Sequence, residues 1–190
     1  MAASLRYGRV AVALHWLSAA AVFALLGVGW WMTALPNGAT LKFVLFQWHK
    51  SVGVTVLLLS LIRLAWRLAH RPPPLPAAMP DWERRAALLG HASLYGLLFI
   101  LPLTGWAVVS TSAYNIPTLL YGLVPWPHLP VLPTLAAKAA VNAALVKIHH
   151  AGAWALAGLL AVHVGAALRH HWQMRDDVLT RMLPRWSSPR

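Results

Sequence analysis

Histidine supplies most of the reactive side chains in this chain. The 190 residues include 10 His but only four Asp or Glu and no Cys. The absence of cysteine excludes disulfide scaffolds, thiol catalysis, Cys-ligated zinc and iron–sulfur clusters. So few carboxylates nearly exclude acid/base dyads and carboxylate metal sites. The chemistry that remains is that of imidazole.

Two of the histidines have a spacing that puts them on one face of a helix. His163 follows His149 by 14 residues, which at about 100° per residue is about 40° short of four full turns. Their side chains therefore project in nearly the same direction, roughly 21 Å apart along the axis. His150 lies about 140° away from His163 and falls off this face.

Four apolar stretches are long enough to cross a hydrocarbon core, which needs about 20 residues. They cover residues 10–32, 49–68, 88–111 and 146–168, and none contains Asp or Glu. The chain is 59% hydrophobic and 11% charged, whereas about a quarter of the residues in soluble domains are charged. We expect an all-α membrane protein, a four-transmembrane-helix bundle formed by a single domain over residues 1–190.

The basic residues predict how the spans are oriented. All the arginines lie in or beside the N-terminus, the connection between the second and third spans, and the C-terminus. The lysines lie at the other two connections. The positive-inside tendency therefore places both termini in the cytoplasm. The same clustering argues against nucleic-acid binding, which the net charge of +12 would otherwise suggest.

This orientation places two histidines at each of two depths. His15 and His163 fall in the inner half of the membrane, and His49 and His149 fall in the outer half. A polar ring in hydrocarbon is costly unless it is paired. Two neutral imidazoles from different helices at each level are what a six-coordinate haem iron needs. Small residues beside them would let a flat macrocycle approach the backbone, namely Gly53, Gly152, Gly165 and Ala167.

Other interpretations of the histidines stay open. The four rings can instead pack in the bundle and form hydrogen bonds without any metal. Zinc is a competing metal, but neither pair has a Cys or carboxylate nearby to complete a zinc site. His91, at the start of the third span, either competes with His15 as the inner ligand, packs structurally or donates a hydrogen bond to a haem propionate. Arg63 and Arg67 either lie near haem propionates or are ordinary positive-inside residues.

Prolines mark two further features. Pro102 is expected to kink the third span. The proline-rich segment 114–134 is expected to form an ordered cap at the outer interface.

The sequence resembles the bacterial cytochrome b561 family over nearly its whole length. The matching pieces keep the family's order along the chain, and they are Arg6-Tyr7, Leu14-His15-Trp16-Leu17, His49 with Gly53, Arg63-Leu64, Arg67-Leu68, Leu89-Gly90-His91, Tyr95, Leu101-Pro102, His149, His163, Ala166-Ala167-Leu168, His170-His171, Leu179 and Arg181-Met182-Leu183-Pro184. The family's haem-ligand positions fall on His15, His49, His149 and His163. His150 departs from the pattern, since an acidic residue follows the ligand in the member type that the chain resembles most.

The resemblance implies a transmembrane cytochrome b domain in the bacterial inner membrane with two haem b groups. His15 and His163 would hold the inner iron, and His49 and His149 the outer iron. It further implies an oxidoreductase that oxidises superoxide to O2 and reduces membrane ubiquinone, with no obligatory protein partner. No catalytic residue is assigned beyond the ligands.

Side chains on the two membrane surfaces are further candidates. His170 or His171 would contact the quinone at the inner surface. Lys50 and Lys147, each next to an outer ligand in the sequence, would steer the superoxide anion.

Two other functions are weighed against this one. The first is a haem-bearing membrane anchor that relays electrons between quinone and a partner dehydrogenase or hydrogenase subunit. The second is a haem-free structural membrane protein.

Overall fold

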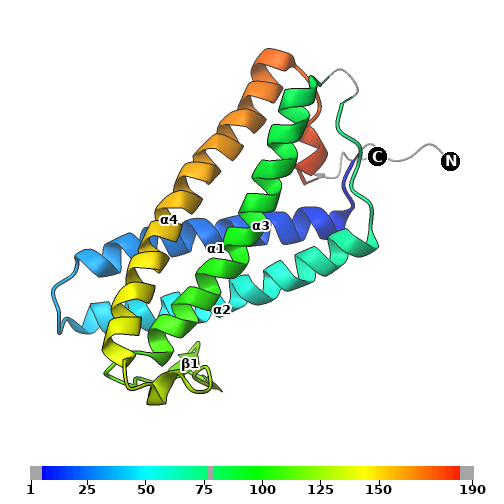
Figure 1. Ribbon diagram of the computed structural model, residues 1–190. Helices are drawn as coiled ribbons and strands as arrows, with labels where there is room; N and C mark the ends of the chain where they lie inside the picture. Colours follow the sequence, from blue (N-terminus) through cyan, green and yellow to red (C-terminus); the bar gives the residue numbers. More distant parts are fainter. Residues whose placement is uncertain (1–5, 77–78, 185–190) are drawn as a thin grey trace.

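The computed structural model describes residues 6–76 and 79–184, and most of this part is helical (Figure 1). The long helices are α1 (Arg9–Ala34), α2 (Thr40–Ala69), α3 (Asp81–Ser110) and α4 (Lys138–Arg169). A short antiparallel pair, β1 (Thr118–Leu120) and β2 (Val124–Trp126), precedes the 3-10 turn η1 (Leu132–Thr134). After α4 come the π-helical turn η2 (His170–Met174) and the 3-10 turn η3 (Thr180–Met182).

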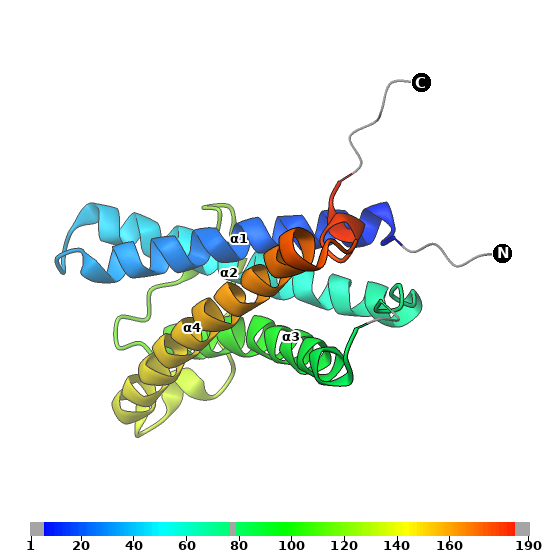
Figure 2. The same ribbon diagram turned by 90° about the horizontal axis from the view of Figure 1, so that it is seen from above.

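The helices form two antiparallel pairs that cross each other, α1 with α2 and α3 with α4 (Figures 1 and 2). Both ends of the described chain and the connection from α2 to α3 lie at one end of the bundle, here called the terminal end. The β1–β2 hairpin and the turn between α1 and α2 lie at the other, here called the hairpin end. All four long helices are long and apolar enough to span a membrane, which confirms the predicted four-helix membrane bundle.

Each long helix extends beyond the apolar stretch predicted from hydropathy at one end at least. The helix α2 begins at Thr40 rather than at 49, and α4 begins at Lys138 rather than at 146. These extra turns carry polar side chains, which lower the local hydropathy but are compatible with a helix. The helix α3 runs unbroken through Pro102, although proline there removes one backbone hydrogen bond.

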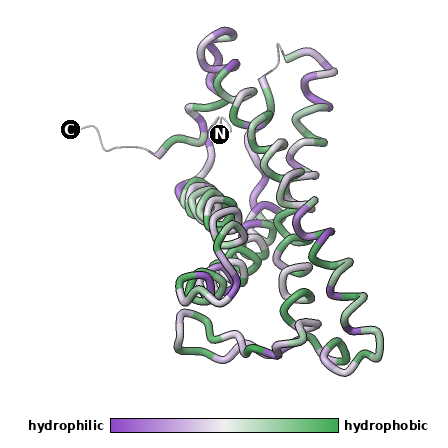
Figure 3. The backbone as a smooth tube through the Cα atoms, turned by 90° about the vertical axis from the view of Figure 1, so that its left-hand side faces the viewer, coloured by the Kyte–Doolittle hydropathy of each residue, from purple (hydrophilic) through white to green (hydrophobic). Residues whose placement is uncertain are grey.

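The interior of the bundle is small because the outer surface faces lipid rather than water. Hydrophobic side chains are exposed along the helices, for example Leu68 at 78%, Val162 at 67% and Trp154 at 65%, and the apolar colouring in Figure 3 follows all four helices. The buried core is one cluster to which every helix contributes, and it consists of Val22, Val56, Leu98, Leu101 and Leu156.

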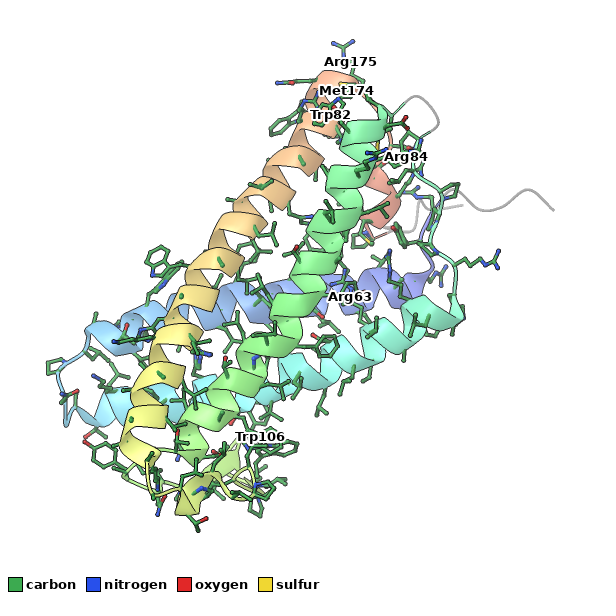
Figure 4. All side chains as sticks on the ribbon, in the orientation of Figure 1. Arg63, Trp82, Arg84, Trp106, Met174 and Arg175 are labelled. Atoms are coloured by element: carbon green, nitrogen blue, oxygen red, sulfur yellow. The ribbon has the colours of Figure 1, made fainter. Side chains whose placement is uncertain are left out.

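The hairpin end is closed by the proline-rich segment. Tyr121 binds α2 twice, since its backbone N–H donates to Ser51 Oγ at 3.0 Å and its hydroxyl lies 2.6 Å from Thr55 Oγ1. The indole of Trp106 on α3, labelled in Figure 4, donates to the carbonyl of Pro127 at 2.8 Å. These contacts make the segment an ordered cap over the helix ends.

Candidate functional site

Two pairs of imidazole rings face each other inside the bundle. His15 on α1 and His163 on α4 have ring centroids 6.4 Å apart, with an angle of 62° between the ring planes. His49 on α2 and His149 on α4 have centroids 6.3 Å apart, at 77°. Each pair joins α4 to the α1–α2 pair, and these are the pairs that the sequence predicted.

The separation of each pair is that of two ligands on opposite sides of one metal ion. A metal–imidazole bond is about 2.0 Å long, and a five-membered ring with bonds of about 1.33 Å has a radius of about 1.1 Å. Two such ligands in line therefore place their centroids about 6.2 Å apart. Both observed separations agree with this value, so the rings fit axial ligation of a haem iron.

The core cluster lies between the two pairs. Leu156 is seven residues from both His149 and His163, about 10 Å along α4 from each. Val22 and Val56 follow His15 and His49 by the same interval. Apolar side chains therefore separate the two levels of histidines.

A cavity of about 310 Å³ opens between the four helices at the level of His49 and His149. Both rings line it, together with Gly53 and the core cluster. His150 also lines this cavity although it is exposed. Its predicted position off the shared face therefore leaves it at the edge of the same space rather than outside it.

Two glycines that the sequence did not single out lie beside the rings of His49 and His149. A Cβ atom on Gly29 would lie 3.3 Å from His49 Cε1, and one on Gly105 would lie 3.2 Å from His149 Cε1. Gly152, which the sequence suggested as room for a macrocycle, instead accommodates a helix contact, because a Cβ there would lie 2.9 Å from Leu101 Cδ2. Close approach of ring to backbone is therefore provided by Gly29 and Gly105.

Thr104 holds the outer ring of His149 in one tautomer. Its hydroxyl donates to the carbonyl of Leu101 at 2.9 Å and so accepts from His149 Nδ1–H, 3.1 Å away. The proton on Nδ1 leaves Nε2 as the nitrogen with a free lone pair. This is the tautomer that an Nε2 metal ligand requires. The Nδ1 atom of His49 is buried and has no hydrogen-bond partner among the described residues.

Arg63 gives the terminal-end pair a different arrangement. Its Nη2 lies 2.9 Å from His15 Nδ1, and because guanidinium only donates, Nδ1 must accept. The ring of His15 therefore carries its proton on Nε2, and Arg63 has to release Nδ1 before Nε2 can bind a metal as a neutral ligand. Figure 4 shows Arg63 among the helices, where it also lies 5.3 Å from the ring centre of Tyr95.

His91 is the third ring at this level, as the sequence analysis allowed. Its Nδ1–H donates to the carbonyl of Ala87 at 2.7 Å, and its ring centroid lies 5.5 Å from that of His163. All three ring pairs are edge-to-face contacts, but this one is shorter than the separation of about 6.2 Å in a linear imidazole–metal–imidazole unit. The geometry favours His15 over His91 as the partner of His163.

The histidines proposed for quinone binding sit on the η2 turn. His170 is buried, with Nδ1 2.5 Å from Asp176 Oδ2 and Nε2 3.8 Å from Glu83 Oε2. Glu83 in turn accepts from Arg169 at 2.9 Å. His170 therefore belongs to a polar cluster that joins α3 to the end of α4, whereas His171 is exposed.

The lysines all lie at the hairpin end, and three of the four donate to oxygens of nearby segments. Lys50 donates to the carbonyl of Pro117 at 3.2 Å, Lys42 to Asn37 Oδ1 at 2.9 Å, and Lys138 to Asn115 Oδ1 at 2.8 Å. Lys147 is exposed. Every carboxylate side chain of the protein lies at the terminal end, so the hairpin end carries uncompensated positive charge.

Four apolar helices that present paired histidines to their own interior define a membrane cytochrome of the b type. The chain belongs to the prokaryotic cytochrome b561 family, because the sequence model of that family matches residues 6–185. The family consists of membrane electron-transfer proteins and implies haem b as the cofactor.

Named relatives match the chain almost end to end. Cytochrome b561 homolog 2 of Escherichia coli (strain K12) is 35% identical over 184 residues, which is 96% of this chain and 94% of the relative. Cytochrome b561 homolog 1 of the same strain is 30% identical over 185 residues, 95% of this chain and 98% of the relative. A probable superoxide oxidase CybB of Yersinia pestis is 26% identical over 189 residues, 95% and 97% of the two chains.

Proposed function

We propose that the protein is a dihaem cytochrome of the bacterial inner membrane that oxidises superoxide to O2 and reduces ubiquinone. A single transmembrane cytochrome b domain over residues 1–190 would carry both haem b groups. Two superoxide anions would each give up one electron and leave as O2, and ubiquinone would take up the two electrons with two protons. The protein would act as an oxidoreductase without an obligatory partner.

One observation carries the proposal, namely the two facing imidazole pairs at 6.3 and 6.4 Å. His49 and His149 would hold one iron, and His15 and His163 the other. Haem held by these histidines would supply reversible one-electron transfer, because two protein ligands to each iron would leave no position for O2. Only apolar side chains of the core cluster lie between the two levels along α1, α2 and α4 at the seven-residue interval.

The distribution of charge supports an orientation and an electron donor. Arginine at the terminal end and lysine at the hairpin end favour cytoplasmic termini. The donor would then meet the hairpin end, where the lysines attract a small anion and no carboxylate repels it. The similarity to a probable superoxide oxidase agrees with superoxide as that anion.

Ligand substitutions test the cofactor assignment. His49→Ala or His149→Ala should remove one haem and largely spare the other, and His15→Ala or His163→Ala should remove the other one. The control is His150→Ala, which should retain both. The measurement is a pyridine haemochrome titration together with the dithionite-reduced spectrum of each purified variant. Loss of a haem from the His150 variant with full retention in the His149 variant would refute the pairing.

Salt dependence tests the electron donor. Superoxide should reduce the purified protein more slowly as ionic strength rises, since the Debye length falls from about 30 Å at 0.01 M to about 10 Å at 0.1 M. Lys50→Gln with Lys147→Gln should lower the rate and flatten its salt dependence. A rate that changes neither with salt nor with these substitutions would contradict electrostatic steering.

A separate assay distinguishes the enzyme from a membrane anchor. If the isolated protein shows no superoxide-dependent reduction of quinone, the result favours an anchor that needs a partner.

A further inference from the structure

A second cavity, of about 510 Å³, lies at the terminal end and is separate from the one beside His49 and His149. The start of α1, the last turns of α2, the extended segment 71–74 and Met182 line it, and Tyr95 of α3 forms part of its wall. Four stretches that are far apart in sequence therefore meet around one space.

The polar lining of this cavity is basic. Four arginines and a histidine line it and no carboxylate does, the basic residues being Arg6, Arg63, Arg67, His70 and Arg71. Within residues 6–76 and 79–184, Arg63, Arg67 and Arg71 form no ion pair. The ion pairs there engage the carboxylates of Glu83, Asp176 and Asp177 elsewhere, with Arg169, His170 and Arg181.

Two of the guanidinium groups lie beside the same tyrosine ring. Arg63 lies 5.3 Å and Arg67 6.0 Å from the ring centre of Tyr95, and both side chains are half-buried. The ring attracts each cation, but it does not neutralise two like charges that have lost part of their hydration. Such an arrangement is stabilised by an anion placed between the guanidinium groups.

The walls of the cavity are fixed by hydrogen bonds between distant segments. Trp16 Nε1–H donates to the carbonyl of Met182 at 2.7 Å, and Arg181 donates to the carbonyl of Pro74 at 2.6 Å. Arg6 donates to the carbonyl of Thr180. Segment 72–74 is a run of prolines and is therefore stiff. The site is assembled before any ligand arrives.

The surface beside the cavity indicates which anion it takes. Leu58 and Ile62 are exposed on α2 and precede Trp66, a lining residue of the cavity, at intervals of four residues, so this apolar face leads to the cavity. An anionic phospholipid would place its phosphate among the guanidinium groups and its acyl chains along this face, whereas free phosphate would use only the first part. Basic pockets between transmembrane helices bind lipid headgroups in this way.

We propose that this cavity binds the phosphate of an anionic phospholipid. The proposal does not depend on the identity of the electron donor or of the haem ligands. The bound lipid would join α1 and α2 to the C-terminal segment, so its loss should lower the thermal stability of the protein.

The test uses the purified holoprotein in micelles that contain increasing fractions of dioleoylphosphatidylglycerol, with dioleoylphosphatidylcholine as the comparison. Phosphatidylglycerol should raise the unfolding temperature of the parent protein at a low mole fraction. Arg67→Gln with Arg71→Gln should require about 30-fold more of this lipid, whereas Arg67→Lys with Arg71→Lys should retain most of the response. The matched control is Arg9→Gln with Arg85→Gln, which removes two exposed charges that do not line the cavity.

Each alternative has its own outcome. An equal loss of response in the control pair would show general attraction to the membrane surface and would overturn the proposal. The same unfolding shift with inorganic phosphate alone would assign the site to a soluble anion. Loss of haem from the Arg67 and Arg71 glutamine variant, measured as pyridine haemochrome, would show that these arginines serve the cofactor instead. An unchanged response in that variant would exclude the site altogether.

Discussion

Replacing Thr104 by valine should raise the reduction potential of the haem that we propose at the His49–His149 pair. Valine has nearly the same shape but lacks the oxygen that accepts from His149 Nδ1–H at 3.1 Å. This hydrogen bond makes the imidazole a stronger electron donor and thereby favours the oxidised iron. A neutral hydrogen bond contributes about 0.5–1.5 kcal/mol. If the hydrogen bond stabilised the oxidised haem by this full amount and the reduced haem not at all, its loss would raise the reduction potential by up to about 60 mV.

The measurement is a spectroscopic redox titration of the purified protein, in which the two proposed haems should appear as two components. One component should shift in the Thr104→Val variant while the other stays, and haem retention at the outer site should fall by about 10-fold or more. Thr104→Ser restores the hydroxyl and should restore the potential. Two unshifted components in the valine variant would refute the role of Thr104, and so would a serine variant that behaves like valine.

Two further substitutions probe the surroundings of the site. Gly105→Ala brings a Cβ to 3.2 Å from His149 Cε1 and should weaken haem retention at the His49–His149 pair alone. The control is Gly158→Ala, whose Cβ meets nothing within 4 Å and which should have no effect. The measurement is the haem content of the two purified variants. Glu83→Gln removes a buried charge 2.9 Å from the half-exposed Arg169 and should lower the free energy of unfolding by about 1–3 kcal/mol. A double-mutant cycle with Arg169→Gln measures this coupling, and strictly additive effects would contradict it.

Helical periodicity was enough to predict which histidines face each other. The 14-residue interval on α4 and the alternating direction of the spans placed His49 opposite His149 and His15 opposite His163, and the structure brings these rings to 6.3 and 6.4 Å. Such reasoning succeeds here because a transmembrane helix has one axis and a fixed rise, so sequence distance converts directly to depth. The fold class follows from length and hydropathy for the same reason.

Contacts between helices could not be predicted in this way, because they depend on how the two pairs cross. A Cβ on Gly29 or Gly105 would press on the ring of His49 or His149, yet nothing in their own sequence neighbourhoods distinguishes these glycines from Gly53 or Gly152. Thr104 reaches His149 across the α3–α4 contact, 45 residues away. The β1–β2 hairpin was also missed, since its proline-rich sequence favours neither strand over loop.

The fourth helix has a consequence for how the protein is made. Helix α4 supplies one ring to each imidazole pair, through His149 and His163, and it is the last of the four to leave the ribosome. A nascent chain that has inserted α1, α2 and α3 therefore already carries His15 and His49 but can complete neither pair. Haem insertion should therefore follow synthesis of α4 rather than accompany synthesis of the first three helices. A chain truncated before α4 should still insert into the membrane but should bind no haem and be colourless.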